Sequence, residues 1–193
     1  MRKWMLCVLM TMPLLLSACG GTGMSEAEEL ALTIRGEYLE TTRWTGRAAV
    51  TADYGQRVYQ YEMTVTASPE ETVLTLTMPE NISGITARIA GKDSRLEYDG
   101  LSVETGPLDG EGLTPVSAIP VQLEAVRSGY MTACVLEEDG LLRMECGDPE
   151  GAPDSGRVVT LWFDTQTHGL KKGEISVDGF RVILCQWEEF VKN

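Results

Sequence analysis

After Trp44 the sequence alternates apolar and polar residues with a period of two. The runs Tyr59–Val65, Leu74–Met78 and Ile85–Ile89 show the alternation most clearly. Successive side chains of a strand point to opposite faces, so this period predicts antiparallel strands with one apolar and one solvated face. Turn-forming residues, such as those at Asp99-Gly100, separate the runs. The chain is therefore restricted to a sheet whose apolar face must be covered.

The rest of the chain adds further strands and two helices. Residues 26 to 41 have helical spacing behind a capping Ser25, and a shorter helix fits residues 121 to 127 before Gly129. The strands that follow are expected at Tyr130–Glu137, Leu141–Cys146, Arg157–Phe163, Glu174–Val177 and Arg181–Trp187. About ten strands with two helices predict an α+β fold. Because two helices cannot easily cover ten strands, either a cavity remains or the sheet curls on itself.

The N-terminus has the order of a lipoprotein signal. Arg2 and Lys3 precede an apolar run that ends at Leu16, which is shorter than the roughly 20 apolar residues that span a bilayer. The run leads into Leu16-Ser17-Ala18-Cys19, which resembles the lipobox of bacterial lipoproteins. We therefore expect residues 1–18 to be a cleaved signal peptide, Cys19 to be lipidated, residues 19–25 to form a tether, and residues 26–193 to form one domain. Such a protein is anchored at the extracytoplasmic face of the cell membrane.

The charge of the chain excludes one class of partner. The sequence has 29 acidic and 16 basic residues, a formal net charge of −13 at pH 7, and signal cleavage removes two of the basic residues. An acidic surface repels phosphate backbones, so nucleic-acid binding is not expected.

Three cysteines remain once Cys7 leaves with the signal and Cys19 carries the lipid. Cys134 and Cys146 are candidates for a disulfide across the hairpin centred on Asp139-Gly140, depending on its register. The alternative is that they are free thiols that behave as small apolar residues, which is the expectation for Cys185.

The order of several local sequences resembles the LolA/LolB-like superfamily, the half-barrel carriers of lipids and lipoproteins in the bacterial envelope. The residues that carry the resemblance are Met78-Pro79-Glu80-Asn81-Ile82-Ser83-Gly84-Ile85, Leu96-Glu97-Tyr98-Asp99-Gly100, Gly112-Leu113-Thr114-Pro115, Val159-Thr160-Leu161-Trp162-Phe163-Asp164 with Gly169, and Glu174-Ile175-Ser176-Val177-Asp178-Gly179. The resemblance implies a strongly curved antiparallel sheet, with an N-terminal and an internal helix on its concave side, around an apolar cavity for acyl chains. The lipidated members of that superfamily are the closer comparison for a chain anchored through Cys19.

The sequence offers little for catalysis or for a metal. The only histidine, His168, lies among turn-forming residues without a nucleophile motif nearby. Zinc requires closely spaced cysteines and histidines, and the acidic stretches 109–111 and 148–150 lack the ligand order of calcium loops. We expect no enzyme activity, no metal and no cofactor.

These observations lead to two hypotheses of function. In the first, the protein binds a lipid, an acylated protein or another amphiphile, without catalysis, in a cavity lined by Met63, Val65, Leu74, Leu76, Met78, Ile89 and Trp162. In the second, the same side chains form an ordinary core, and the protein is an envelope adaptor that binds a protein partner. A carrier should contain a continuous apolar pocket, whereas an adaptor should be solid inside and expose an apolar patch or an unpaired strand edge.

Overall fold

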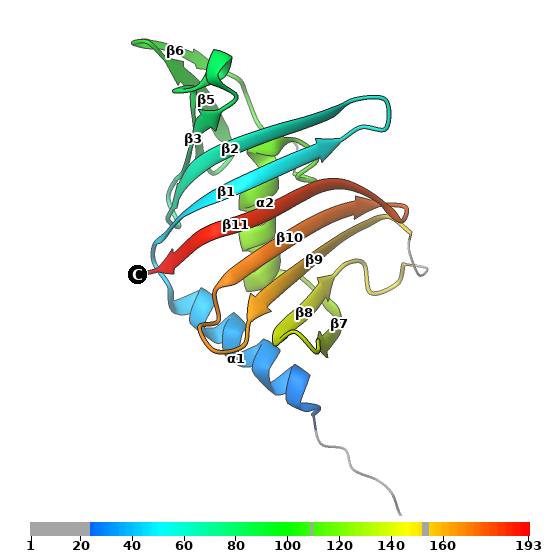
Figure 1. Ribbon diagram of the computed structural model, residues 1–193. Coiled ribbons are helices and arrows are strands. Elements are labelled where there is room, and N and C mark those ends of the chain that lie inside the picture. Colours follow the sequence, from blue (N-terminus) through cyan, green and yellow to red (C-terminus); the bar gives the residue numbers. More distant parts are fainter. Residues whose placement is uncertain (1–23, 109, 152–154) are drawn as a thin grey trace, which may run out of the picture.

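The computed structural model describes residues 24–108, 110–151 and 155–193. The predicted signal peptide, Cys19 and most of the tether lie outside these residues. The described strands form one open antiparallel sheet with the order β6-β5-β4-β3-β2-β1-β11-β10-β9-β8-β7 (Figure 1).

The elements follow one another along the chain as helix, strands, helix, strands. They are α1 (Glu26–Glu40), β1 (Trp44–Asp53), β2 (Val58–Ala67), β3 (Thr72–Met78), the 3-10 turn η1 (Glu80–Ile82), β4 (Thr86–Ala90), β5 (Asp93–Tyr98), β6 (Leu101–Glu104), α2 (Pro115–Ser128), β7 (Met131–Leu136), β8 (Leu141–Cys146), β9 (Arg157–Asp164), β10 (Leu170–Val177) and β11 (Phe180–Lys192). Among the described residues, neither helix has the length and apolar character needed to cross a membrane.

The first and last strands meet in the middle of the sheet. β1 pairs with β11 from Trp44 opposite Lys192 to Ala52 opposite Ile183. All other neighbours in the sheet are consecutive in sequence, so two meanders extend from this central pair. One is β2–β6, which we call the arm, and the other is β7–β10.

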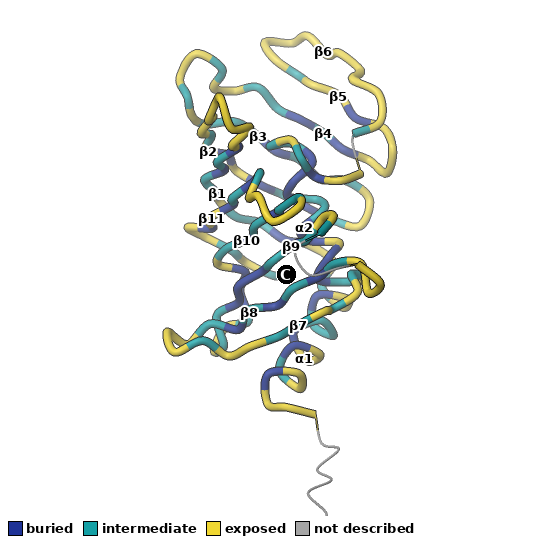
Figure 2. Tube along the Cα trace, turned by 90° about the vertical axis from the view of Figure 1, so that its right-hand side faces the viewer, coloured by how far each residue is buried: buried dark blue, intermediate teal, exposed yellow. Residues whose placement is uncertain are grey.

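The two helices cover only part of the concave face. α2 packs against β1, β11 and β9, and α1 packs against α2, β7 and β8. Figure 1 shows α2 crossing behind the central strands and α1 at the end of the molecule farthest from β6. Figure 2 shows that β5 and β6 are mostly exposed, whereas buried segments are concentrated in the central strands. The arm therefore extends beyond the helices.

Apolar side chains from the helices and the central strands form the core. Tyr38 of α1 packs edge-on against Phe163, with ring centroids 5.6 Å apart, and stacks on Phe190 at 5.9 Å. Ile119 and Val126 of α2 are fully buried against the strands. Burial of such side chains contributes about 1.5–3 kcal/mol each relative to leaving them exposed.

The structure confirms the predicted α+β fold, with a curved antiparallel sheet and an N-terminal and an internal helix on one face. The predicted start of the internal helix is wrong. α2 begins at Pro115, because the Thr114 hydroxyl accepts a hydrogen bond from the Ser117 backbone N–H and Pro115 fits the first helical position. Pro120 lies inside the helix beyond its first turn, where it has no N–H to donate to the Val116 carbonyl one turn earlier.

Alanine substitutions at two glycines would test how the helices pack. A Cβ atom at Gly173 of β10 would collide with the side-chain amide of Gln122, which is fully buried in α2. We expect Gly173→Ala to lower the free energy of unfolding by about 1–3 kcal/mol. A Cβ at Gly36 of α1 would meet nothing within 4 Å, so Gly36→Ala should raise it by about 0.5–1 kcal/mol. Chemical denaturation of both variants measures these differences, and equal effects of the same sign would contradict the close contact between Gln122 and Gly173.

Candidate functional site

Strand pairing assigns the side chains of the arm to two faces. Val65 lies opposite Leu74, Leu74 opposite Ala87, and Ala87 opposite Leu96. Leu96 in turn lies opposite Val103 of β6. Directly opposed residues of an antiparallel pair share a face, so one apolar row crosses the arm from the core to the outermost strand.

The inner end of this row and the neighbouring positions on the same face are closely packed. Met63, Val65 and Leu74 are at most 2% exposed, and Ile89 belongs to the same buried cluster. Leu76 is partly buried against it. Five of the residues predicted to line a cavity therefore lie together in or beside the core, where side chains of α2 occupy the space next to the central strands.

The structure separates the other two predicted residues from this group. Met78 lies opposite Glu62 across a register shift and is 43% exposed. Trp162 lies between Leu161 and Phe163, which are both fully buried, and pairs with Arg143 and Lys172 on the opposite, outer face. There its indole N–H donates to Glu137 at 3.1 Å, and the Lys172 ammonium lies 3.9 Å from the ring centroid. Trp162 cannot line a cavity on the concave face.

The outer part of the row is an exposed apolar surface that the sequence analysis did not single out. Leu96, Tyr98, Leu101 and Val103 are 37%, 53%, 73% and 62% exposed, and we call these four residues the arm surface. The turn at Asp99 and Gly100, both with positive φ, reverses the chain so that β5 and β6 present them on one face. The alternation of Leu101 and Val103 after the turn was the available signal, but the strand is only four residues long.

The opposite face of the arm carries charge. Arg88 donates to Glu97 at 2.9 Å and to Glu71 at 3.1 Å, and Arg95 donates to Glu97 at 2.9 Å. The hydrogen bond from Arg88 lowers the pKa of Glu97. The arm is therefore amphipathic, with ion pairs on its outer face and solvent-exposed apolar side chains on its concave face.

A groove lies where the arm meets α2. It has a volume of about 540 Å³ and opens to solvent, and the apolar residues along it are Ile89, Pro107, Leu108, Pro120 and Val121. Lys92 and Glu124 add a charge of each sign. This size is within the range of small-ligand sites.

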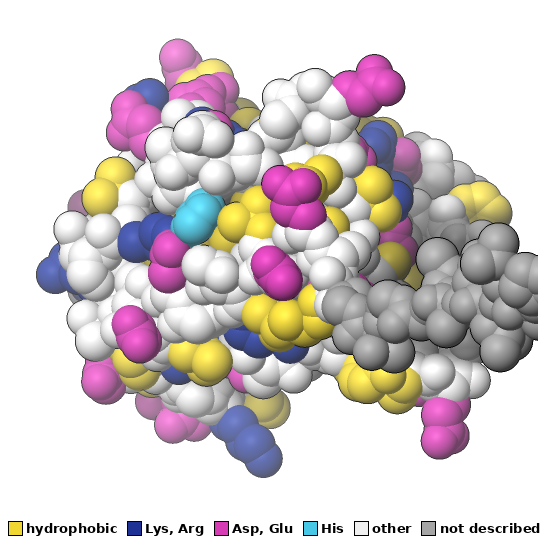
Figure 3. Space-filling model, turned by 90° about the horizontal axis from the view of Figure 1, so that it is seen from below, with side chains coloured by type: hydrophobic (Ala, Val, Ile, Leu, Met, Phe, Trp, Pro, Cys, Tyr) yellow, Lys and Arg dark blue, Asp and Glu magenta, His cyan; other side chains and the backbone are white. Residues whose placement is uncertain are grey.

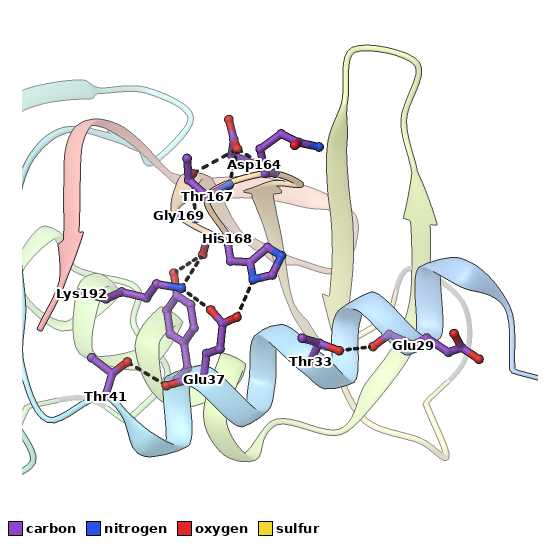
Figure 4. A network of polar contacts seen from close by, with 11 residues as sticks. Glu29, Thr33, Glu37, Thr41, Asp164, Thr167, His168, Gly169 and Lys192 are labelled. Atoms are coloured by element: carbon purple, nitrogen blue, oxygen red, sulfur yellow. Dashed lines mark hydrogen bonds and ion pairs between the residues drawn. The ribbon is translucent and has the colours of Figure 1, made fainter.

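The single histidine takes part in contacts that connect α1 to the sheet. The Nδ1 atom of His168 lies 2.6 Å from Glu37 Oε1, and Lys192 Nζ lies 2.5 Å from Glu37 Oε2 (Figure 4). The Tyr38 hydroxyl donates to the His168 carbonyl at 3.3 Å. Figure 3 shows the histidine at the surface of this end of the molecule, beside basic and acidic side chains. These partners join α1, the β9–β10 turn and β11 and present no nucleophile.

The cysteines are free thiols in the structure. Cys134 lies opposite Met144 and Cys146 opposite Met131, so the hairpin register does not place the two directly across from each other. Burial raises the pKa of all three thiols, and that of Cys185 reaches about 12. Within the described ranges, no group of three or more histidine, cysteine, aspartate or glutamate residues could hold a metal ion.

No protein-family model and no curated protein matches the sequence. Similar solved structures include an uncharacterized conserved protein from Thermus thermophilus, with a TM-score of 0.49 and 13% identity over 88% of each chain. A LolA superfamily protein from Nitrosomonas europaea has a TM-score of 0.44 and 12% identity over 86% of this chain and 93% of its own. The lipoprotein LppX from Mycobacterium tuberculosis has a TM-score of 0.44 and 14% identity over 86% and 96%. Identities this low say nothing about what this chain binds.

Thiol labelling tests the burial of the cysteines. At pH 8 the raised pKa keeps Cys185 in the unreactive thiol form, and its side chain is fully buried. We expect a maleimide to label the partly exposed Cys134 first and Cys185 only after unfolding, as measured by peptide mass mapping. If Cys134 and Cys146 stay unlabelled in denaturant until a reductant is added, they form the disulfide that the sequence left open.

The Glu37 contacts predict a pH-dependent contribution to stability. Burial raises the pKa of Glu37, but hydrogen bonds from Lys192 and His168 outweigh it, and the pKa lies below the ordinary 4.5. When the pKa of a carboxyl group is lower in the folded than in the unfolded protein, ionisation of that group stabilises the fold above the unfolded-state pKa. This stabilisation is lost as the pH falls through the folded-state pKa. Glu37→Gln should therefore lower the free energy of unfolding at pH 7 and cost progressively less below about pH 4.5.

Denaturation curves at several pH values measure this difference, with Glu40→Gln on the same helix as the control. A pH-independent loss in Glu37→Gln would show that the carboxylate charge does not hold α1 in place.

Proposed function

We propose that this protein is a lipoprotein of the cell envelope, anchored at the extracytoplasmic face through Cys19, that acts as a non-catalytic adaptor for a protein partner. The observation that carries the proposal is the arm surface, which neither helix covers. Water-exposed apolar side chains gathered on one face of a sheet are typical of a protein-binding site. Leu101 and Val103 project the most exposed apolar area of this surface.

The position of the arm supports a partner that lies away from the membrane. If residues 19–25 are the tether that the sequence predicts, it would span at most about 3.3–3.6 Å per residue and would keep the start of α1 near the anchor. β6 lies at the opposite end of the molecule from α1 (Figures 1 and 2). Anchoring through Cys19 would therefore hold α1 toward the membrane and present β6 to other proteins of the envelope.

The interior supports an adaptor more than an enclosed carrier. A carrier must shield most of an acyl chain from water, which requires a deep apolar cavity. Met63, Val65 and Leu74 are instead closely packed, as expected of an adaptor with a filled core.

A second function is supported by the groove beside α2. Its apolar lining at Ile89, Leu108 and Val121 could hold part of a lipid, an acylated protein or another amphiphile, with Lys92 near the polar end. This carrier function predicts that a copurifying lipid is lost when Val121 is replaced by a charged residue. The adaptor function predicts no such dependence.

Photocrosslinking in cells tests the adaptor function. A photoreactive amino acid at Val103 of the full-length lipoprotein should crosslink to one protein at defined stoichiometry, and Leu101→Asp should reduce that crosslink by about tenfold or more, because a charge replaces an apolar contact. Both positions are more than half exposed, so folding should be unaffected.

The matched control places the same photoreactive residue at Phe180, which is 78% exposed at the start of β11. The same crosslinked protein from Phe180, or a crosslink from Val103 that Leu101→Asp leaves unchanged, would refute binding through the arm surface.

A further inference from the structure

We propose that the partner binds by strand addition, with an extended segment of alternating apolar and basic residues pairing along the free edge of β6. The inference rests on the proposed adaptor function and specifies its binding mode. Among the described residues, β6 is the outermost strand of the sheet and has a strand on one side only. The other outermost strand, β7, has α1 packed against it. One end of the sheet is thus supported by a helix and the other is open.

The hairpin register identifies the main-chain groups at the open edge. Thr105 N–H donates to the Ser94 carbonyl at 2.9 Å, so these two residues form a hydrogen-bonded pair. Bonded and non-bonded pairs alternate along an antiparallel ladder. Val103 and Leu101, two and four residues before Thr105, therefore direct their main-chain groups toward β5. Ser102 and Glu104 direct theirs outward, and both are exposed.

The outward N–H and C=O groups recur at every second residue of β6, which is the spacing at which an added strand forms hydrogen bonds. Two residues of β6 can exchange hydrogen bonds with a segment laid beside it, as in peptide recognition by sheet edges. The added segment continues the pleat, so its alternate side chains fall on the two faces of the arm.

The two faces specify the chemistry of that segment. Side chains on the concave side extend the arm surface beside Leu101 and Val103 and must be apolar. Side chains on the outer side lie beside Ser102 and Glu104. Glu104 lies opposite Arg95, whose guanidinium pairs with Glu97, and Glu104 itself has no salt bridge among the described residues. The chain as a whole has a formal charge of −13. A basic side chain on the outer face complements this charge.

A proline substitution tests strand addition separately from apolar docking. Ser102→Pro removes an outward N–H while leaving the main-chain bonds to β5, and proline is tolerated on edge strands. Ser102→Ala, the matched control, retains the N–H. The probe is a fluorescent peptide of alternating valine and lysine, and its affinity for the full-length lipoprotein in detergent micelles is measured by anisotropy.

We expect the peptide to bind the parent protein and Ser102→Ala equally and Ser102→Pro about tenfold or more weakly, because a partner carbonyl loses its donor. A peptide of alternating valine and glutamate should bind more weakly than the lysine peptide. Glu104→Lys should reverse that preference without requiring any change in the backbone. Thermal unfolding of each variant shows whether the arm is intact.

Several results would overturn the inference. The first is that a folded Ser102→Pro variant binds the lysine peptide as tightly as the parent protein does. The second is that a peptide of the same composition, with its apolar residues at helical spacing, binds equally well. The third is that Glu104→Lys leaves the preference for the lysine peptide unchanged. Displacement of the peptide when phosphatidylcholine is added to the micelles would assign the edge to lipid and overturn the inference as well.

The photocrosslink from Val103 separates this failure from that of the adaptor function. If the crosslink persists in Ser102→Pro and is lost in Leu101→Asp, strand addition fails while apolar docking stands. If it persists in both variants, both proposals fail.

Discussion

The structure depends on the need to cover the apolar face of a sheet that is wider than two helices. Each strand that joins the sheet adds apolar side chains to one face, and water must be excluded from them. α2 meets this need for the strands around the central β1–β11 pair, and α1 meets it for β7 and β8. The strands of the arm join the same face without a helix of their own. The uncovered apolar residues are thus a direct result of how the covering elements are distributed.

The covered and uncovered parts of the sheet differ in composition. Beneath α2, the absence of a side chain at Gly173 leaves the space that the buried Gln122 side chain fills. On the arm, Tyr98, Leu101 and Val103 are large and project from the pleat. Ion pairs around Arg88 join β4 to β5 and to Glu71 on the outer face of the same strands.

Much of the fold could be predicted from the sequence, because period-two alternation and turn residues identify strands locally. The runs around Met63, Leu74 and Ile89 became buried strand positions as expected. What each apolar row faces could not be predicted, since this depends on where α2 lies. Trp162 shows a further limit: Leu161, Trp162 and Phe163 are consecutive and apolar, so the alternation that assigns faces is absent there. The arm surface escaped notice because its last strand is short and its exposure depends on the absence of a covering helix.

The pairing of β1 with β11 also affects when the protein can fold. The centre of the sheet joins residues such as Val50 and Cys185, which are far apart in sequence, and both meanders depend on it for their place in the core. Contacts between distant segments form late, because the intervening chain must first lose its conformational freedom. A ribosome that has released β1 through β10 has not yet produced the strand that completes the central pair. The complete sheet can therefore form only after almost the whole chain is available, because its central pair joins the first strand to the last.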